Sequence, residues 1–306
     1  MRKIITLSSP PPPRLQEVLP VRPIRYVLVH YHIFKNAGST IEYVLHRAFG
    51  ERLRTIHGPN PDSVLTGADL ARFLTKNPGV DAISSHHLKY PVPEIARMHI
   101  IDCCFLRDPI QRLWSMHKYF RRAEPNDELS ERAKASDLRS FVGMLIRDHP
   151  QMINDVQVNL LANSGVYLKP PNRVDFDRAH DVLRRIGILG VVCMFDESLT
   201  AAEYYIRPVF PIEFQYVRHN ASSNDGDTDV NPGIRIRELL GVRMHEELLR
   251  LNQLDLELVE CAKKEVSRRF RMMPDRDERL ADFGRRCEIL RANFEEISLV
   301  GKGASG

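Results

Sequence analysis

Short apolar runs alternate with amphipathic stretches along most of the chain. β-Branched and aromatic runs predict buried strands at residues 26–33, 80–85, 99–106 and 188–192. Apolar residues at helical spacing predict helices at residues 39–49, 67–75, 109–121, 137–148, 152–162, 175–186, 197–206, 244–270 and 276–294. Strands that alternate with helices predict an α/β fold: a central, mainly parallel sheet flanked by helices in three layers, with a C-terminal helical extension.

The same pattern divides the chain into three parts. We expect a proline-rich leader at residues 1–24, a single α/β domain at residues 25–296 with a polar loop at 219–233, and a flexible tail at 297–306. The apolar stretch of the leader is too short for a signal peptide or an anchor. No run approaches the ~18 uncharged apolar residues of a membrane span. We therefore expect a cytoplasmic protein without a transmembrane segment.

Composition narrows the choice of ligand. The chain has 44 Lys and Arg against 40 Asp and Glu, a formal net charge of +4. This excess suits an anionic ligand but is too weak and too dispersed to predict nucleic-acid binding. The five cysteines include no CxxC pair, so we expect neither a disulfide framework nor a metal site, and a reducing compartment fits best.

The segment HIFKNAGST lies between the first predicted strand and the first predicted helix. Backbone N–H groups and the positive end of a helix dipole converge at such a position. Gly38 allows close approach of a ligand, Ser39 and Thr40 add hydroxyls that can also cap the helix, and Lys35 adds a cation. The segment predicts an anion cradle, and the alternative is an ordinary turn with a capping serine. It is not a Walker A loop, in which the lysine directly precedes Ser or Thr.

The segment FLRDPIQRLWS follows the third predicted strand. Arg107 offers a planar fork suited to phosphate, Ser115 offers a hydroxyl two turns into the next helix, and Asp108 can cap that helix. The alternative is a structural ion pair at Arg107 and a solvated Ser115. Because both segments follow strands of one parallel sheet, we expect them to face one cleft with two anion sites.

These two segments resemble those of the PAPS-dependent sulfotransferases, particularly the carbohydrate branch that includes heparan sulfate 2-O-sulfotransferase. In that family a PKTGST-like loop binds the 5′-phosphosulfate of PAPS (3′-phosphoadenosine 5′-phosphosulfate), and an LRDPxxRxxS segment binds its 3′-phosphate. This chain has FKNAGST and LRDPIQRLWS, and further likeness lies in ISSHH, DVQVNLLANSG, ILGVVCMFDESL and RHNASS. Phe34 and Asn36 depart from the usual Pro and Thr. The resemblance implies a P-loop-like fold and transfer of a sulfuryl group from PAPS to a hydroxyl of a glycan or glycosylated small molecule, without a metal.

The resemblance also implies roles for individual residues. It assigns the 5′-phosphosulfate to Lys35, Asn36, Ala37, Gly38, Ser39 and Thr40, and the 3′-phosphate to Arg107 and Ser115. Lys35 would also stabilise the leaving phosphate. The base that takes the proton from the acceptor hydroxyl would be His86 or His87, with family position favouring His86.

Other polar residues receive structural expectations or open alternatives. His30 and His32 are expected to pack, His117 to lie at the surface, and Trp114 to pack its helix rather than stack on adenine. Asn154, Gln157 and Asn159 either position the acceptor or are helix-surface amides, and Asn220 and Ser222 border the nucleotide by resemblance. Two functions compete with sulfuryl transfer: a nucleotide-dependent kinase and a non-catalytic nucleotide-binding module. The long C-terminal helices are a candidate surface for a homodimer.

Overall fold

A parallel sheet forms the centre of the protein. The computed structural model describes residues 24–60, 63–124, 127–217 and 232–303, the last nine as backbone only. The sheet has five strands in the order β2-β3-β1-β4-β5, and every pairing is parallel. The strands are β1 (Arg25–Tyr31), β2 (Leu53–Thr55), β3 (Ala82–Ser85), β4 (Met98–Leu106) and β5 (Ile188–Val191). The predicted α/β fold with a central parallel sheet is therefore confirmed.

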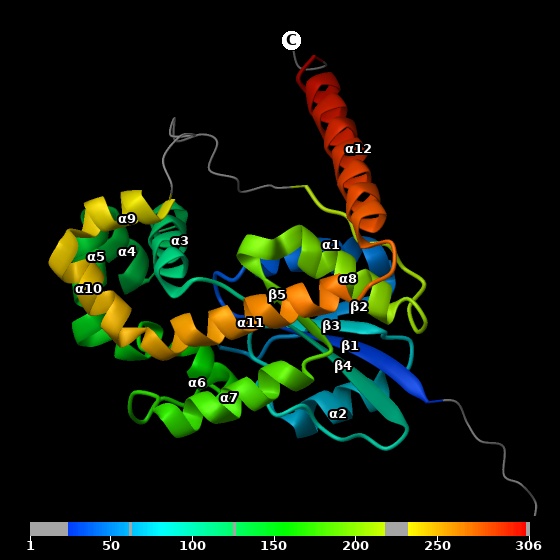
Figure 1. Cartoon of the computed structure of the whole chain (residues 1–306), viewed down its shortest axis with the longest axis horizontal. Helices are drawn as coiled ribbons and strands as arrows, with labels where there is room; N and C mark the ends of the chain where they lie inside the picture. Colours follow the sequence, from blue (N-terminus) through cyan, green and yellow to red (C-terminus); the bar gives the residue numbers. More distant parts are fainter. Residues whose placement is uncertain (1–23, 61–62, 125–126, 218–231, 304–306) are drawn as a thin grey trace, which may run out of the picture.

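Helices cover both faces of the sheet (Figure 1). One face packs against α1 (Gly38–Phe49), α8 (Phe195–Ile206) and the first half of α12 (Arg276–Gly303). The other face packs against α2 (Gly67–Lys76), α6 (Val156–Asn163), α7 (Arg173–Arg185) and α11 (Gln253–Arg271). A separate helical cluster lies beside the sheet and contains α3 (Pro109–Arg122), α4 (Glu128–Ala135), α5 (Leu138–Asp148), α9 (Pro232–Leu240) and α10 (Val242–Leu251). These layers place the loops that follow the strands next to the helical cluster.

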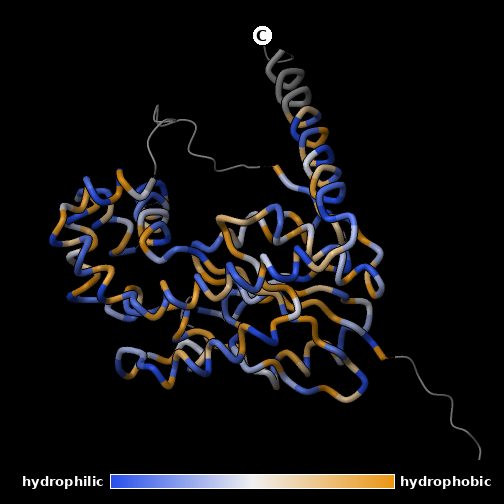
Figure 2. Tube along the Cα trace, viewed as in Figure 1, coloured by the Kyte–Doolittle hydropathy of each residue, from blue (hydrophilic) through white to orange (hydrophobic). Residues whose placement is uncertain are grey.

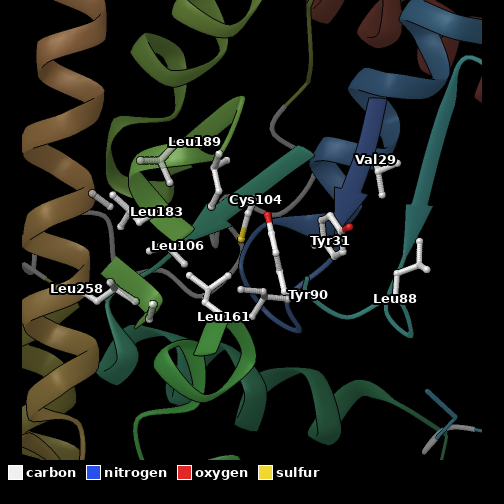
Figure 3. Close-up of a cluster of buried hydrophobic side chains, with 14 of the residues drawn as sticks. Val29, Tyr31, Leu88, Tyr90, Cys104, Leu106, Leu161, Leu183, Leu189 and Leu258 are labelled. Atoms are coloured by element: carbon white, nitrogen blue, oxygen red, sulfur yellow. The ribbon is translucent and has the colours of Figure 1, made fainter. Parts of the chain in front are cut away.

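Burial of the sheet explains why its strands are continuous apolar runs. In β1 the side chains alternate between faces: Val27, Val29 and Tyr31 join one core cluster, and Leu28 joins the other. Hydrophobic positions accordingly concentrate along the strands and the inward faces of the helices (Figure 2). Figure 3 shows the cluster on the face of α6, α7 and α11. Fully burying one leucine such as Leu28 contributes roughly 1.5–3 kcal/mol.

Several boundaries differ from the predictions. The predicted helix 244–270 is two helices, α10 and α11, separated at the buried Asn252, whose side chain donates to the carbonyl oxygen of Leu248 at 2.9 Å. A side-chain hydrogen bond of this kind competes with the helical pattern and breaks it. One strand, β2, and two α-helices, α4 and α9, were not predicted, and α12 continues past residue 294 to Gly303. Residues 1–23, most of the predicted polar loop, Asn220, Ser222 and residues 304–306 lie outside the described residues.

Two further observations bear on the sequence-based expectations. None of the helices in the described ranges is long and apolar enough to cross a membrane. All five cysteines fall in the described ranges and none forms a disulfide, with Cys103 and Cys104 buried in the sheet as predicted.

Candidate functional site

The two predicted anion-binding segments meet at the carboxyl edge of the sheet. β1 is the central strand and pairs with β3 on one side and β4 on the other, with Tyr31 opposite Ser85. The loop after β1, the histidines after β3 and Arg107 after β4 therefore emerge side by side. This is the point where strand order reverses, the usual ligand position in open parallel sheets.

The loop between β1 and α1 is held in a left-handed conformation. Lys35 and Ala37 have φ angles of 66° and 62°, and Ala37 is the N-cap of α1 without a side-chain cap. Such angles cost non-glycine residues about 1–2 kcal/mol each. The predicted capping by Ser39 or Thr40 is therefore wrong, because this turn places both residues inside the first helical turn. Both residues line a cavity instead.

That cavity has a volume of about 820 Å³. It brings together most of the residues assigned by resemblance: Lys35, Ala37, Gly38, Ser39, Thr40, His86, Arg107 and Ser115. Two predicted site residues are not on its wall. Asn36 is buried beneath the loop, and His87 lines a neighbouring cavity.

The wall of this cavity is electropositive. Four cationic side chains line it, Lys35, Arg107, Lys118 and Arg122, and the described lining residues include no Asp or Glu. Burial, together with Arg107 and Arg122, lowers the pKa of Lys35, whose Nζ lies 4.5 Å from the centre of the Tyr119 ring. Burial also lowers the pKa of Arg107. Positive charges held close together in a partly buried cavity attract an anion, which relieves their repulsion.

Gln157 connects the two segments beneath the cavity. Its Oε1 accepts from the Asn36 side chain at 2.8 Å and from the Arg107 backbone N–H at 2.9 Å. Its Nε2 donates to the Arg107 carbonyl oxygen at 2.8 Å and to Asp255 at 3.3 Å. The Arg107 guanidinium in turn donates to the Lys35 carbonyl oxygen at 3.0 Å. Asn36 and Gln157 therefore fix the strained loop and the Arg107 segment relative to each other.

The burial of the candidate amide side chains excludes one of the two alternatives that the sequence left open for them. Asn154, Gln157 and Asn159 are all buried, so none is a helix-surface amide. The helix carrying Gln157 packs under the ligand loops, with its first backbone N–H groups bonded to Asp255.

His86 lies on the cavity wall and has one ring nitrogen free to accept a proton. Its Nδ1 lies 3.2 Å from the carbonyl oxygen of His32, which can only accept, so the neutral ring carries its proton on Nδ1 and a lone pair on Nε2. Burial is the main cause that lowers the pKa of His86 to about 4, with His32 and His57 lowering it and Glu42 opposing them. The ring is therefore neutral at pH 7.

His87 differs from His86 in which ring nitrogen carries the proton. Its Nδ1 accepts from the Gly58 backbone N–H at 2.7 Å, so the neutral ring carries its proton on Nε2 and has no lone pair free for a substrate. Of the two candidate bases, His86 alone lines the cavity that holds Lys35.

A hydrogen-bonded chain beside His86 was not foreseen. His32 Nδ1 pairs with Glu42 at 3.3 Å, Ser84 donates to the same carboxylate oxygen at 2.8 Å, and the Ser84 hydroxyl accepts from His30 at 2.9 Å. The hydrogen bond from His32 is the first of the causes that lower the pKa of Glu42 to about 2. His30 is buried, as expected, and burial lowers its pKa to about 3.

Within this chain, His32 also lines the cavity, although the sequence predicted only packing. Its ring packs against His86 at a tilt of 31°, with centroids 3.5 Å apart. A Cβ atom at Gly38 would overlap the His32 ring, so the glycine is required by this histidine as well as by close approach of a ligand.

The remaining candidates have structural positions. Asp108 caps α3 as predicted, accepting from the Gln111 N–H at 2.8 Å. Trp114 packs in the helical cluster as expected. The expectation of a surface position for His117 is wrong, because it is buried against Phe141, with ring centroids 5.1 Å apart. No group of three His, Cys, Asp or Glu side chains that could hold a metal ion occurs among the residues that the structure describes.

Comparison with known proteins adds one relative. No family model matches the chain. A protein of Archaeoglobus fulgidus, described as an uncharacterized protein, is 25% identical over 249 residues. The match covers 77% of this chain and 95% of the relative, so the two proteins are similar over most of their lengths.

Proposed function

We propose that this protein is a sulfotransferase that uses PAPS as its sulfuryl donor. One observation carries the proposal: a single electropositive cavity contains the Lys35 loop at one end of a helix, Arg107 and Ser115 on another wall, and a neutral histidine. Two anion-binding groups in one cavity suit a nucleotide with phosphates at two positions. The resemblance of both segments to the PAPS-dependent family supports the same donor.

Each residue of the cavity has a place in donor binding. The Gly38 backbone and the Ser39 and Thr40 hydroxyls, at the positive end of α1, hold the 5′-phosphate. Arg107 and Ser115 hold the 3′-phosphate. Asn36 takes a different part from the one that the resemblance gave it, since its amide fixes the loop from beneath.

The transfer step follows from the positions of His86 and Lys35. His86 Nε2 accepts the proton of the acceptor hydroxyl as the hydroxyl oxygen bonds to sulfur. The bond between sulfur and the bridging phosphate oxygen breaks, and Lys35 stabilises the negative charge that develops there. The products are a sulfate ester and adenosine 3′,5′-bisphosphate, and the proton remains on His86.

The alternatives agree less well with the cavity. A nucleotide-dependent kinase holds magnesium with acidic side chains beside the phosphates, and the described lining residues supply none. A non-catalytic nucleotide-binding module has no use for a neutral histidine whose lone pair is free. As part of this proposal we place the protein in the cytoplasm, where cysteines stay reduced, because none of its five cysteines forms a disulfide.

The proposal is tested by transfer from [³⁵S]PAPS to a panel of phenols, alcohols and oligosaccharides. Lys35→Ala should lower kcat by roughly 10²–10³-fold, and His86→Ala by roughly 10²–10⁴-fold. Matched controls are Lys76→Ala and His46→Ala, whose side chains are exposed away from the cavity, and both should keep wild-type rates. Wild-type rates in both site variants would overturn the assignment of catalysis to this cavity.

A further inference from the structure

A second cavity adjoins the first and also reaches His86. Its volume is about 640 Å³, within the range of small-molecule sites. The two cavities share four lining residues: His32, Phe34, His86 and Tyr119. A ligand in the second cavity would therefore approach His86 from the side opposite the Lys35 loop.

The walls of the second cavity are mainly apolar and aromatic. Tyr31 and Tyr90 stack with ring centroids 4.2 Å apart, and Leu161 and Cys104 lie beside them at the end of the sheet (Figure 3). These residues belong to the core cluster on this face of the sheet, so the cavity opens directly onto the hydrophobic core. Phe34, which replaces the usual proline of the family loop, adds a further aromatic surface.

Its charge differs sharply from that of the first cavity. Apart from histidines, Lys89 is the one ionisable cation among the described lining residues, and no acid is present among them. The Lys89 ammonium donates to the carbonyl oxygen of His86 at 3.0 Å, and burial lowers its pKa. A polyanion would therefore meet one partly buried amine here, against four cations in the donor cavity.

The rim of the cavity is apolar as well. Val64 and Val166 line it and are 54% and 55% exposed. Exposed aliphatic side chains at the mouth of an apolar cavity are typical of a site that takes an apolar ligand.

We propose that this second cavity binds the sulfuryl acceptor, and that the acceptor is an uncharged hydroxyl compound with an apolar ring body, such as a phenol. This inference rests on the proposed sulfotransferase function. It replaces the glycan acceptor that the resemblance implied with a different class of molecule. The hydroxyl reaches His86 at the boundary of the cavities, and the ring body packs against Tyr31, Tyr90 and Leu161.

The basicity of His86 agrees with this choice. Burial holds its pKa near 4, which makes it a weak base. A weak base accepts a proton most readily from an acidic hydroxyl. Phenols, with a pKa of about 10, are far more acidic than sugar alcohols.

The test compares two acceptors of the sulfuryl group of [³⁵S]PAPS. One is 2-naphthol, and the other is an unsulfated acidic hexasaccharide that contains glucuronic acid. Binding of 2-naphthol to the ligand-free protein is measured by calorimetry, and the affinities for adenosine 3′,5′-bisphosphate and adenosine 5′-monophosphate are measured on the same preparation. We expect 2-naphthol to bind and to be sulfated, and the hexasaccharide to be inert.

A rim variant tests the location. Val166→Glu should raise the KM for 2-naphthol at least tenfold while the KM for PAPS is unchanged. Leu168→Glu, at a position that is 91% exposed and does not line the cavity, should behave as wild type.

The outcomes separate the two proposals. Sulfation of the hexasaccharide but not of 2-naphthol, or an unchanged KM for 2-naphthol in Val166→Glu, overturns the acceptor assignment and leaves the sulfotransferase standing. No binding of 2-naphthol to the ligand-free protein also overturns it. Failure to bind adenosine 3′,5′-bisphosphate more tightly than adenosine 5′-monophosphate contradicts the donor instead.

Discussion

The hydrogen bonds of Gln157 link the two ligand-binding segments, and replacing this residue tests how far the site depends on that link. In Gln157→Leu, the backbone N–H and carbonyl oxygen of Arg107 each lose their hydrogen bond to the side chain. Leaving a buried polar group unsatisfied costs about 1–3 kcal/mol. Asn36 keeps its second bond, to the Phe105 carbonyl oxygen, and Asp255 keeps its bonds to backbone N–H groups. The second N–H of the Asn36 amide also loses its acceptor, so three groups are left unsatisfied and the free energy of unfolding should fall by at least about 3 kcal/mol.

Urea unfolding and calorimetry measure the two consequences. The unfolding midpoint should drop with an unchanged m-value, and the affinity for adenosine 3′,5′-bisphosphate should fall at least tenfold because Arg107 is no longer fixed. Gln151→Leu is the matched control, since Gln151 is exposed. If Gln157→Leu and Gln151→Leu gave the same midpoint and the same affinity, the Gln157 hydrogen bonds would not fix Arg107 for nucleotide binding.

A second variant distinguishes the loss of donors from the loss of acceptors. In Gln157→Glu, the introduced carboxylate can still accept from Asn36 and from the Arg107 N–H, but it cannot donate and it faces Asp255. Its folded-state pKa should therefore be raised, so that destabilisation is largest at neutral pH and lessens as pH falls through that pKa. Destabilisation that did not change between pH 7 and pH 5 would argue against this account.

Three other results are expected. Because burial lowers the pKa of His86 in the ligand-free protein to about 4, the neutral, active ring predominates above that value. The ratio kcat/KM should therefore stay level from pH 7 to about 5 and fall only below it, and an acid limb centred near pH 6.5 would contradict the assigned environment. Gly38→Ala should cost about 1–3 kcal/mol in urea unfolding, because its Cβ overlaps the His32 ring, whereas Gly79→Ala, with open space around it, should be neutral; equal stability of both would refute the packing argument. Lys35→Ala should retain wild-type stability while it loses transfer activity, because its ammonium contacts an aromatic ring rather than an ion-pair partner that its loss would leave buried, and a large fall in its unfolding midpoint would indicate a structural role.

The fold was largely predictable because buried parallel strands leave long apolar runs in a sequence. β2 was missed because only Leu53 of its three residues is buried. α4 was missed because its sequence is charge-rich and only Ser130 and Ala133 are buried. Such elements form through tertiary contacts that a local pattern does not record.

Part of the cavity lining was also predictable from the sequence. Lys35 and Arg107 were found because each closely follows a strand, and Ser115 because it lies two turns into the helix that follows Arg107. Gln157 was named only as a possible acceptor-positioning residue, and its link between the two segments was missed because its partners lie 50 and 121 positions away along the chain. The importance of His32 likewise depends on Glu42, which lies on the helix beyond the loop.

The donor is the central claim, and one calorimetric comparison tests it most directly. Adenosine 3′,5′-bisphosphate and adenosine 5′-monophosphate differ only in the 3′-phosphate that we assign to Arg107 and Ser115. Charge-assisted hydrogen bonds of about 1.5–3 kcal/mol predict that the bisphosphate binds roughly 10- to 150-fold more tightly, and that Arg107→Ala abolishes most of this preference. Equal affinity of the wild-type protein for the two nucleotides would contradict the assignment.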